Sequence, residues 1–283
     1  MIKLKLLWRY MKHHPGSFLL NLLCTLATLA VAGVLVLVVG YIVVMGVPNL
    51  TPSLFSLHYN SDNVSLLPAL LNTIIMTVLS LAIAVPLGVG GAIYLAEYAS
   101  KDNKLVKIVR VTAETLSGIP SILYGLFGMM FFVTTLKWSY SLLAGGMTLA
   151  IMILPLILRT TEEALLSIPD SYREGSFGLG AGRLRTVIRI VLPPAGSGIL
   201  AGIILAIGRV VGETAALMYT AGTVADLPKG LMSSGRTLAV HMYVLSGEAL
   251  HVKEAYATAV VLLVIVVGMN TLSSYIAKRL TRG

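Results

Sequence analysis

Long stretches without charge are the feature that most restricts what this chain can fold into. Asp, Glu, Lys and Arg are absent from 13–61, 63–96, 115–136, 138–158, 190–208 and 255–277. A helix needs about 20 mostly apolar residues to cross the hydrocarbon core of a bilayer. A closed barrel could also satisfy its backbone groups there, but its strands alternate in polarity over about 10 residues, which these stretches do not. The sequence therefore predicts an all-α polytopic membrane protein.

Six transmembrane helices are expected, at 18–46, 68–97, 111–135, 140–166, 195–220 and 255–278. The first apolar stretch is about twice as long as the core of a signal peptide, so we expect a retained helix there. Basic residues collect in cytoplasmic loops. With the N-terminus inside, 16 Lys and Arg residues fall inside and 4 outside, and Arg209 lies within a span. Both termini are therefore predicted to be cytoplasmic, and the net charge of +9 reflects topology rather than nucleic-acid binding.

The loop 167–193, between the fourth and fifth spans, is the most informative expected cytoplasmic segment. Ser167 with Asp170 three residues later suggests a capping box, so a short helix is expected to follow. Three glycines between 178 and 182 would end that helix. A second helical stretch at 184–191 should stop at Pro193, because proline lacks a backbone donor.

The short helix of this loop carries residues suited to a partner protein. Phe177 and Leu179 would be exposed unless something covers them, and Arg173 and Glu174 could pair with charges on a partner. Amphipathic helices of this kind can lie in a groove of another protein. The alternative is an ordinary amphipathic loop on the membrane surface.

The loop resembles the EAA loop of type I ABC-importer permeases, whose pattern is E-A-A-x3-G-x9-I-x-L-P. The matching positions are Glu174, Gly175, Ser176, Gly180, Ile190, Leu192 and Pro193. Every spacing agrees, and the two alanines are replaced by other small residues. The resemblance implies that these residues, with Arg173 and Phe177, dock onto a separate ATPase subunit.

The resemblance also implies a domain division and a division of labour. Residues 68–276 would form the ABC-importer transmembrane domain, with its coupling loop at 167–193, and residues 1–67 would add a cytoplasmic N-terminus, the first helix and an outer loop. A P-loop needs a Gly-Lys pair to hold phosphates, and this chain contains none. We therefore expect no enzymatic activity and no cofactor on this chain, with ATP-Mg bound by the partner ATPase.

Arg209 and Glu213 are charges inside the fifth expected span. An unpaired arginine in hydrocarbon costs roughly 3 kcal/mol or more, and residues four apart share one helix face, so Glu213 is expected to neutralise Arg209 at rest. An arriving oxyanion could compete, because the guanidinium fork fits phosphate oxygens. Gly198 and Gly202 should allow a close helix approach. We interpret Arg209 and Glu213 as substrate-pathway residues; the alternative is an ion pair that serves helix packing only.

The segment from Arg209 to Ala216, R-x-x-G-E-T-A-A, resembles the fifth-span signature of phosphate-specific ABC importers of the Pst type. The stretches 85–98, 117–122 and 158–165 agree and favour the A-type permease subunit. The resemblance implies a bacterial cytoplasmic (inner) membrane and lipid contact. It also implies a second homologous permease, two ATPase copies and an extracytoplasmic phosphate-binding protein.

Three alternative functions stay open at this point, of which the weakest is a membrane scaffold or sensor, because it would leave Arg209 and Glu213 without a purpose. The chain could serve an importer of another oxyanion, such as molybdate or sulfate. It could also be a self-sufficient secondary transporter, although such carriers often show paired repeats with broken helices, and no second copy of 208–213 is visible.

The remaining charged residues have expected local roles. Glu114 follows Arg110 by four residues, which favours a local helix pair. Arg236 is expected to be a solvated charge of the outer loop 221–254. The histidines show no metal-ligand spacing, and the single cysteine, Cys24, is expected to be an apolar filler.

Overall fold

The computed structural model describes residues 15–100, 102–247 and 251–280, and every regular element within these ranges is helical. The basic residues among the first 14, together with Lys101 and Arg282, entered the charge count but lie outside the described residues. The α-helices are α2 (Pro15–Gly46), α3 (Leu67–Ile93), α4 (Lys104–Ser117), α5 (Ser121–Gly128), α6 (Leu142–Leu166), α7 (Asp170–Gly178), α8 (Arg183–Thr186), α9 (Leu192–Val211), α10 (Ala215–Thr220), α11 (Leu238–Gly247) and α12 (Val252–Leu280). Shorter 3-10 or π-helical turns are η1 (Val47–Asn49), η2 (Pro52–Phe55), η3 (Tyr94–Tyr98), η4 (Met129–Thr135) and η5 (Val187–Val191).

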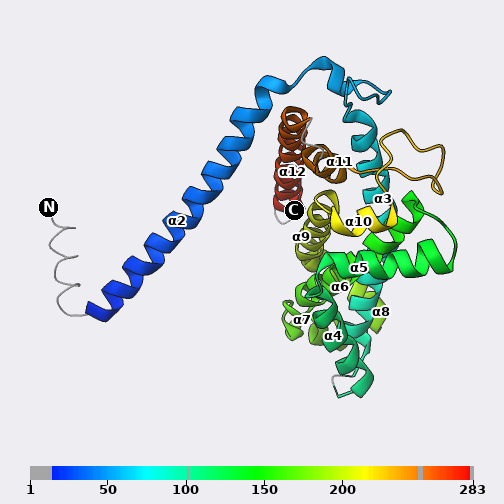
Figure 1. Cartoon of the computed structure of the whole chain (residues 1–283). Helices are drawn as coiled ribbons and strands as arrows, with labels where there is room; N and C mark the ends of the chain where they lie inside the picture. The colour runs from blue at the N-terminus through cyan, green and yellow to red at the C-terminus, as the bar shows by residue number, and fades with distance from the viewer. Residues whose placement is uncertain (1–14, 101, 248–250, 281–283) are drawn as a thin grey trace.

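The helix α6 lies at the centre of the bundle (Figure 1). Of its most apolar window, 67% is buried inside the structure, whereas the corresponding value for α2 is 0%. It packs most extensively against α3 and then against α9. Fully buried apolar side chains of α6 pack against those of α3 and α10 in one cluster, which includes Met76, Leu149, Ile153, Ile157 and Leu217. This core positions the remaining helices.

Glycines bring α9 close to α6. A Cβ at Gly202 would collide with the hydroxyl of Thr160, and a Cβ at Gly198 would lie 2.7 Å from that of Ala164. Only glycine therefore fits at these contacts. The prediction that both glycines allow close helix approach is confirmed.

The third expected span, 111–135, is not one straight helix. The chain bends by 103° between α4 and the helix formed by α5 and η4. Pro120 lacks a backbone donor and disfavours helical conformation at Ile119, so the helix ends at Ser117 and restarts at Ser121. The first part of α4 contains charged residues, so the predicted span began at 111, whereas the helix begins at Lys104.

The fifth span also differs from the predicted bounds of 195–220. Residues 183–211 form one continuous helical run through α8, η5 and α9. Pro193 does not stop it, because the prolines lie in the first turn of α9 and a π-helical turn precedes them. The run ends at Val211, where Gly212 caps it through Gly208.

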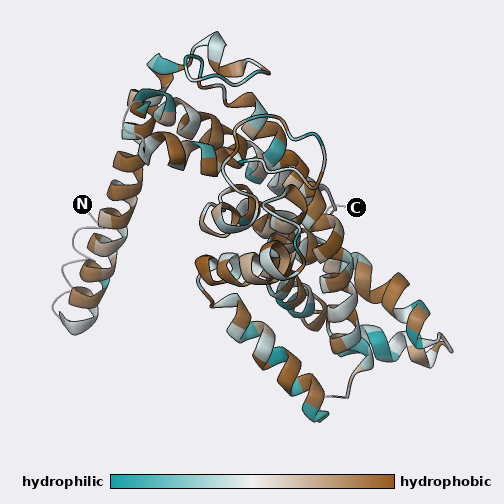
Figure 2. Ribbon diagram, turned by 45° about the vertical axis from the view of Figure 1, so that its right-hand side comes forward, coloured by the Kyte–Doolittle hydropathy of each residue, from teal (hydrophilic) through white to brown (hydrophobic). Residues whose placement is uncertain are grey.

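The helix α2 leans away from the bundle and is apolar on all sides (Figures 1 and 2). It touches α12 near its C-terminal end, where Tyr41 meets Tyr256 edge to face at 5.7 Å. Five helices are long and apolar enough to cross a membrane, or six if the bent pair counts as one span. The all-α, six-span fold predicted from the sequence is confirmed among the described residues.

Candidate functional site

The helix α7 follows α6 directly, and its end at Gly178 agrees with the sequence prediction. The expected capping box, however, is wrong. Ser167 donates its hydroxyl to the Ala164 carbonyl at 2.7 Å and so belongs to the end of α6. The residue before α7 is Pro169, which makes no side-chain cap.

A groove of ≈ 740 Å³ runs between α7 and the helical stretch α8–η5. Four of the motif positions, Gly175, Ser176, Gly180 and Ile190, line it together. Its remaining lining residues are Ser171, Tyr172, Leu179, Ala181, Arg185 and Arg189. The spacing of the motif thus brings residues from two helices to one surface.

Two motif residues shape this groove from within. The hydroxyls of Ser176 and Thr186 lie 2.8 Å apart and are buried, which holds α7 against α8. Gly180 has φ +81°, a conformation that favours glycine. It closes the end of α7, with its N–H donating to the Phe177 carbonyl at 2.9 Å.

The outer side of α7 and α8 carries exposed apolar side chains. Leu179 is 92% exposed, and Phe177 and Leu184 are also exposed large apolar side chains. Glu174 and Pro193 are exposed, and Leu192 is half-buried. The expected exposed apolar surface is therefore present.

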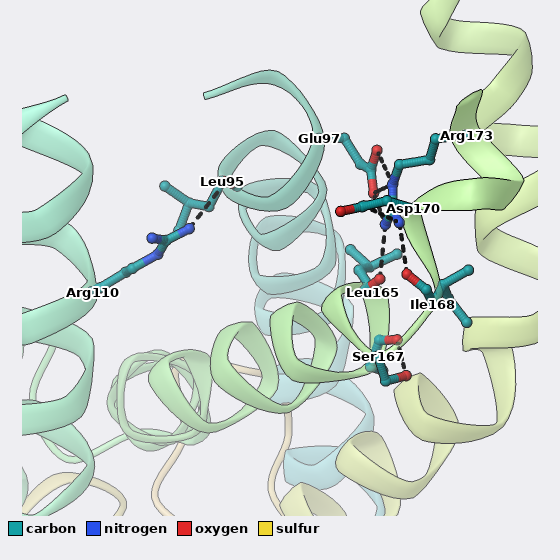
Figure 3. A network of polar contacts seen from close by, with 9 residues as sticks. Leu95, Glu97, Arg110, Leu165, Ser167, Ile168, Asp170 and Arg173 are labelled. Carbon is teal, nitrogen blue, oxygen red and sulfur yellow. Dashed lines mark hydrogen bonds and ion pairs between the residues drawn. The ribbon is translucent and has the colours of Figure 1, made fainter. Parts of the chain in front are cut away.

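Arg173 lies differently from the prediction that it would pair with a partner. It points into the bundle, and its side chain is 13% exposed (Figure 3). Nε and Nη2 donate to Glu97 at distances down to 2.6 Å, and Nη2 also donates to the Leu165 carbonyl at 2.9 Å. Nη1 donates to the Ile168 carbonyl at 2.8 Å and to Asp170 at 3.1 Å. The hydrogen bond to Glu97 raises the pKa of Arg173 above its ordinary value.

Arg110 also has a different partner from the one expected. Its Nε donates to Glu162 on α6 at 2.7 Å. Its Nη2 donates to the Leu95 carbonyl at 3.3 Å (Figure 3). Glu114 instead lies 3.6 Å from Arg159. The local i,i+4 pair is therefore replaced by contacts between α4 and α6.

Arg209 and Glu213 do not share a helix face as predicted. The helix ends between them, and the Glu213 carboxylate turns to accept the Ala216 N–H at the start of α10, at 3.0 Å. Arg209 is half-buried at the end of α9 and makes no hydrogen bond or ion pair within the described part of the chain. The expected resting neutralisation is therefore absent from this structure.

Sequence reasoning missed a buried polar group on the 221–247 segment. Arg236 was expected in solvent, yet it is 4% exposed, and its Nε and Nη2 have no acceptor among the described residues. Its guanidinium lies over the Tyr59 ring at 4.8 Å. His241 is buried nearby, and its ring nitrogens make no hydrogen bond within normal geometry, although the Val64 backbone lies close. No sequence signal distinguished these residues from ordinary loop charges.

The groove beside α7 and Arg209 lie at opposite ends of α9. Arg209 follows Leu192 by 17 positions, which at a rise of 1.5 Å per residue corresponds to about 25 Å. The structure therefore holds two separate candidate sites joined by one helix, rather than one combined centre.

Comparisons with known proteins agree with this arrangement. Residues 88–283 match the family model "Binding-protein-dependent transport system inner membrane component". "Probable ABC transporter permease protein YqgI" of Bacillus subtilis (strain 168) is 35% identical, with 75% of this chain and 77% of that protein covered. "Phosphate transport system permease protein PstA" of Mycobacterium leprae (strain TN) is 34% identical, with 71% and 67% covered.

Solved structures share the fold. A chain of a bacterial ABC transporter for import of the acidic polysaccharide alginate superposes with a TM-score of 0.69 at 15% identity, covering 97% of this chain and 99% of that one. A chain of the MetNI methionine ABC transporter gives a TM-score of 0.58 at 22% identity, covering 76% and 93%. At these identities the likeness concerns the fold alone. The family match covers more than half of the sequence, and this chain therefore belongs to the binding-protein-dependent transport system inner membrane components.

Proposed function

We propose that this chain is a membrane-spanning permease subunit of an ATP-driven importer of inorganic phosphate. It would form the translocation pathway with a second permease subunit, receive phosphate from an extracytoplasmic binding protein, and be driven by two copies of a separate ATPase. Relatives named as phosphate transport permeases support the choice of phosphate over other oxyanions.

The observation that carries the phosphate assignment is the state of Arg209. Its guanidinium is half-buried near the end of a span and has no carboxylate of its own within the described residues. An arginine in that setting gains most from an anion, and its planar fork matches two phosphate oxygens. Glu213 is held by Ala216, so it does not compete for the guanidinium. In this proposal Glu213 lines the pathway as the residue that fixes α10.

The coupling surface would be the groove between α7 and η5 together with exposed Leu179 and Phe177. An apolar, uncovered helix face beside a groove suits docking into a partner. Glu174, being exposed, is available to pair with the ATPase. ATP-Mg would be bound by that partner.

The substrate proposal is tested by phosphate uptake into proteoliposomes that contain the permease with its co-purifying subunits, with and without ATP. We expect Arg209→Gln to abolish uptake while the complex still assembles, and the matched Arg159→Gln variant to keep uptake. Normal phosphate uptake by Arg209→Gln would refute the substrate role. Uptake driven by an ion gradient without ATP would instead favour a secondary transporter. Stronger uptake of molybdate or sulfate would favour another oxyanion.

The docking proposal is tested by cysteine crosslinking in a Cys24→Ala background. A Cβ at Gly175 meets nothing within 4 Å, so Gly175→Cys should be tolerated and should crosslink to the ATPase. Ser176 is buried against Thr186, so Ser176→Cys should react much less. Absence of any Gly175→Cys crosslink in every nucleotide state would count against docking at this surface.

A further inference from the structure

The Arg173 guanidinium joins three helices at one point (Figure 3). A guanidinium carries five N–H groups, and the contacts of Arg173 include two acceptors for Nη1, two for Nη2 and the Glu97 carboxylate for Nε. Glu97 lies in η3, which follows α3. Leu165 lies in the last turn of α6, Ile168 lies in the turn after it, and Arg173 itself lies on α7. The fork is therefore fully used inside this chain.

The acceptors of Arg173 are groups that need a donor. The carbonyls in the last turn of a helix lack intrahelical donors; Leu165 supplies one of these in α6, and Ile168 supplies a carbonyl in the turn between α6 and α7. The Glu97 side chain is only 6% exposed. Removing one member of such a buried pair leaves the other charge uncompensated. The contact is thus a rigid joint rather than a loose surface pair.

The helices joined here are those that form the core of the bundle. The helix α3 packs along α6, and α6 packs on α9 through the glycine contact at Gly202. The far end of α9 holds Arg209. A displacement of α7 that is passed to α6 and α3 would therefore reach the proposed pathway through packed helices.

We propose that Arg173 and Glu97 are positioning residues that make α7 move as one body with α3 and α6. In this inference Arg173 does not contact the ATPase; it transmits the movement of the coupling helix to the spans. Glu97, which lies in the stretch 85–98, accepts the hydrogen bonds of Arg173 and so receives the movement of α7. The inference rests on the proposed function, because it assumes that an ATPase moves α7.

The test measures how much phosphate is imported per ATP hydrolysed in proteoliposomes, which a merely structural defect would not change in the complexes that remain. We expect Arg173→Gln and Glu97→Gln each to lower this ratio by roughly fivefold or more. The double variant should be no worse than either single variant, because both remove the same joint. Arg173→Lys keeps the charge but has only three donors, so it should fall between wild type and Arg173→Gln.

A second measurement shows whether the ATPase still docks. The Gly175→Cys crosslink to the ATPase should form equally in wild type, Arg173→Gln and Glu97→Gln. If Arg173→Gln lost the crosslink while Glu97→Gln kept it, Arg173 would be an ATPase contact and the inference would be wrong. An unchanged import ratio in both single variants, or fully additive effects in the double variant, would also overturn it.

The matched control is Arg159→Gln, which removes an exposed arginine from the same end of α6 and should leave the import ratio unchanged. The wild-type complex separately reports on the proposed function. If wild type imported no phosphate, the proposed function would fail first. If it imported phosphate and both joint variants kept its ratio, only this inference would fail.

Discussion

The arginines at the α7 end of the bundle and those farther along the chain have opposite environments. Arg173 and Arg110 are held by buried or half-buried carboxylates and by helix-terminal carbonyls. Arg209 and Arg236 make no ion pair within the described residues, although one is half-buried and the other almost fully buried. All four carry the same charge, so the difference lies in what surrounds them.

This contrast separates two uses of a buried cation. A guanidinium paired with a buried carboxylate stabilises one arrangement of helices. Removing it leaves the carboxylate unpaired and lowers the free energy of unfolding. An unpaired guanidinium lowers stability in the resting protein and gains when an anion arrives. Under the proposed function, the α7 end would keep the helices in one arrangement, whereas Arg209 would be available to bind an arriving anion. Matched substitutions on the two sides can test this reading.

The largest expected effect on stability comes from Arg110→Met compared with Arg209→Met. Arg110→Met leaves Glu162, whose side chain is 10% exposed, without its partner, and we expect a loss of about 2–3 kcal/mol because Arg110 itself is partly solvated. Arg209→Met removes a charge that has no partner and should cost nothing. Thermal unfolding of the purified protein in detergent compares the two. Equal losses in both variants would break the contrast.

The next largest effect on stability is a pH dependence that comes from His241, which lies on α11 outside the candidate spans. Burial, with a smaller contribution from Arg236, lowers the pKa of His241 to about 3. The unfolded chain therefore takes up a proton below its ordinary pKa of about 6.5, while the folded chain stays neutral. Stability should fall by about 2 kcal/mol from pH 7 to pH 5 on account of this group.

The His241→Gln variant removes that titration and should flatten the decline in Tm over the same pH range. His58→Gln changes an exposed histidine in the loop between η2 and α3 and is the matched control. An equally steep decline in His241→Gln and wild type would show that His241 is not held neutral by its surroundings.

The next smaller effect concerns Glu213, which the structure places at the start of α10. Glu213→Ala should lower stability by about 1 kcal/mol, as loss of a helix cap does. Glu213→Gln keeps an oxygen that can accept the Ala216 N–H and should restore most of it. Uptake measurements sharpen the result: if Glu213→Gln is stable but transports poorly, the charge itself serves the pathway.

The apolar stretches predicted the spans well because length and composition are local properties of the chain. The breaks were harder to predict. The α4–α5 bend follows from Gly118 and Pro120, whereas the similar signal at Pro193–Pro194 produced no break, since prolines are tolerated in a first helical turn. A single sequence does not show which of these outcomes packing selects.

The partners of the charged residues were the least predictable part. The i,i+4 rule paired Arg110 with Glu114 and Arg209 with Glu213, yet neither pair forms. Arg110 pairs with Glu162 on α6 instead. The helix ends between Arg209 and Glu213, so those two side chains do not share a face. The EAA-like motif was predictable because its fixed spacing places four of its residues on one groove, while the partner of Arg173, 76 residues away, was not.

The smallest effect is expected from Arg159→Gln, which tests whether pairing or burial decides the contrast. Arg159 contacts Glu163 at 2.8 Å and Glu114 at 3.6 Å, so by distance it is as well paired as Arg110. Its side chain is 49% exposed, and those of its partners are more exposed still. Water and salt screen such pairs, and holding long side chains in place costs entropy.

We therefore expect no measurable change in Tm or phosphate uptake for Arg159→Gln, at low salt or at high salt. If this variant lost as much stability as Arg110→Met, an ion pair alone would be sufficient and burial would not matter. The absence of an ion pair at Arg209 would then no longer distinguish its environment from those of Arg110 and Arg173. If the effect is absent, the stabilising value of the α7 end resides in Arg110 and Arg173, whose carboxylate partners are withdrawn from water.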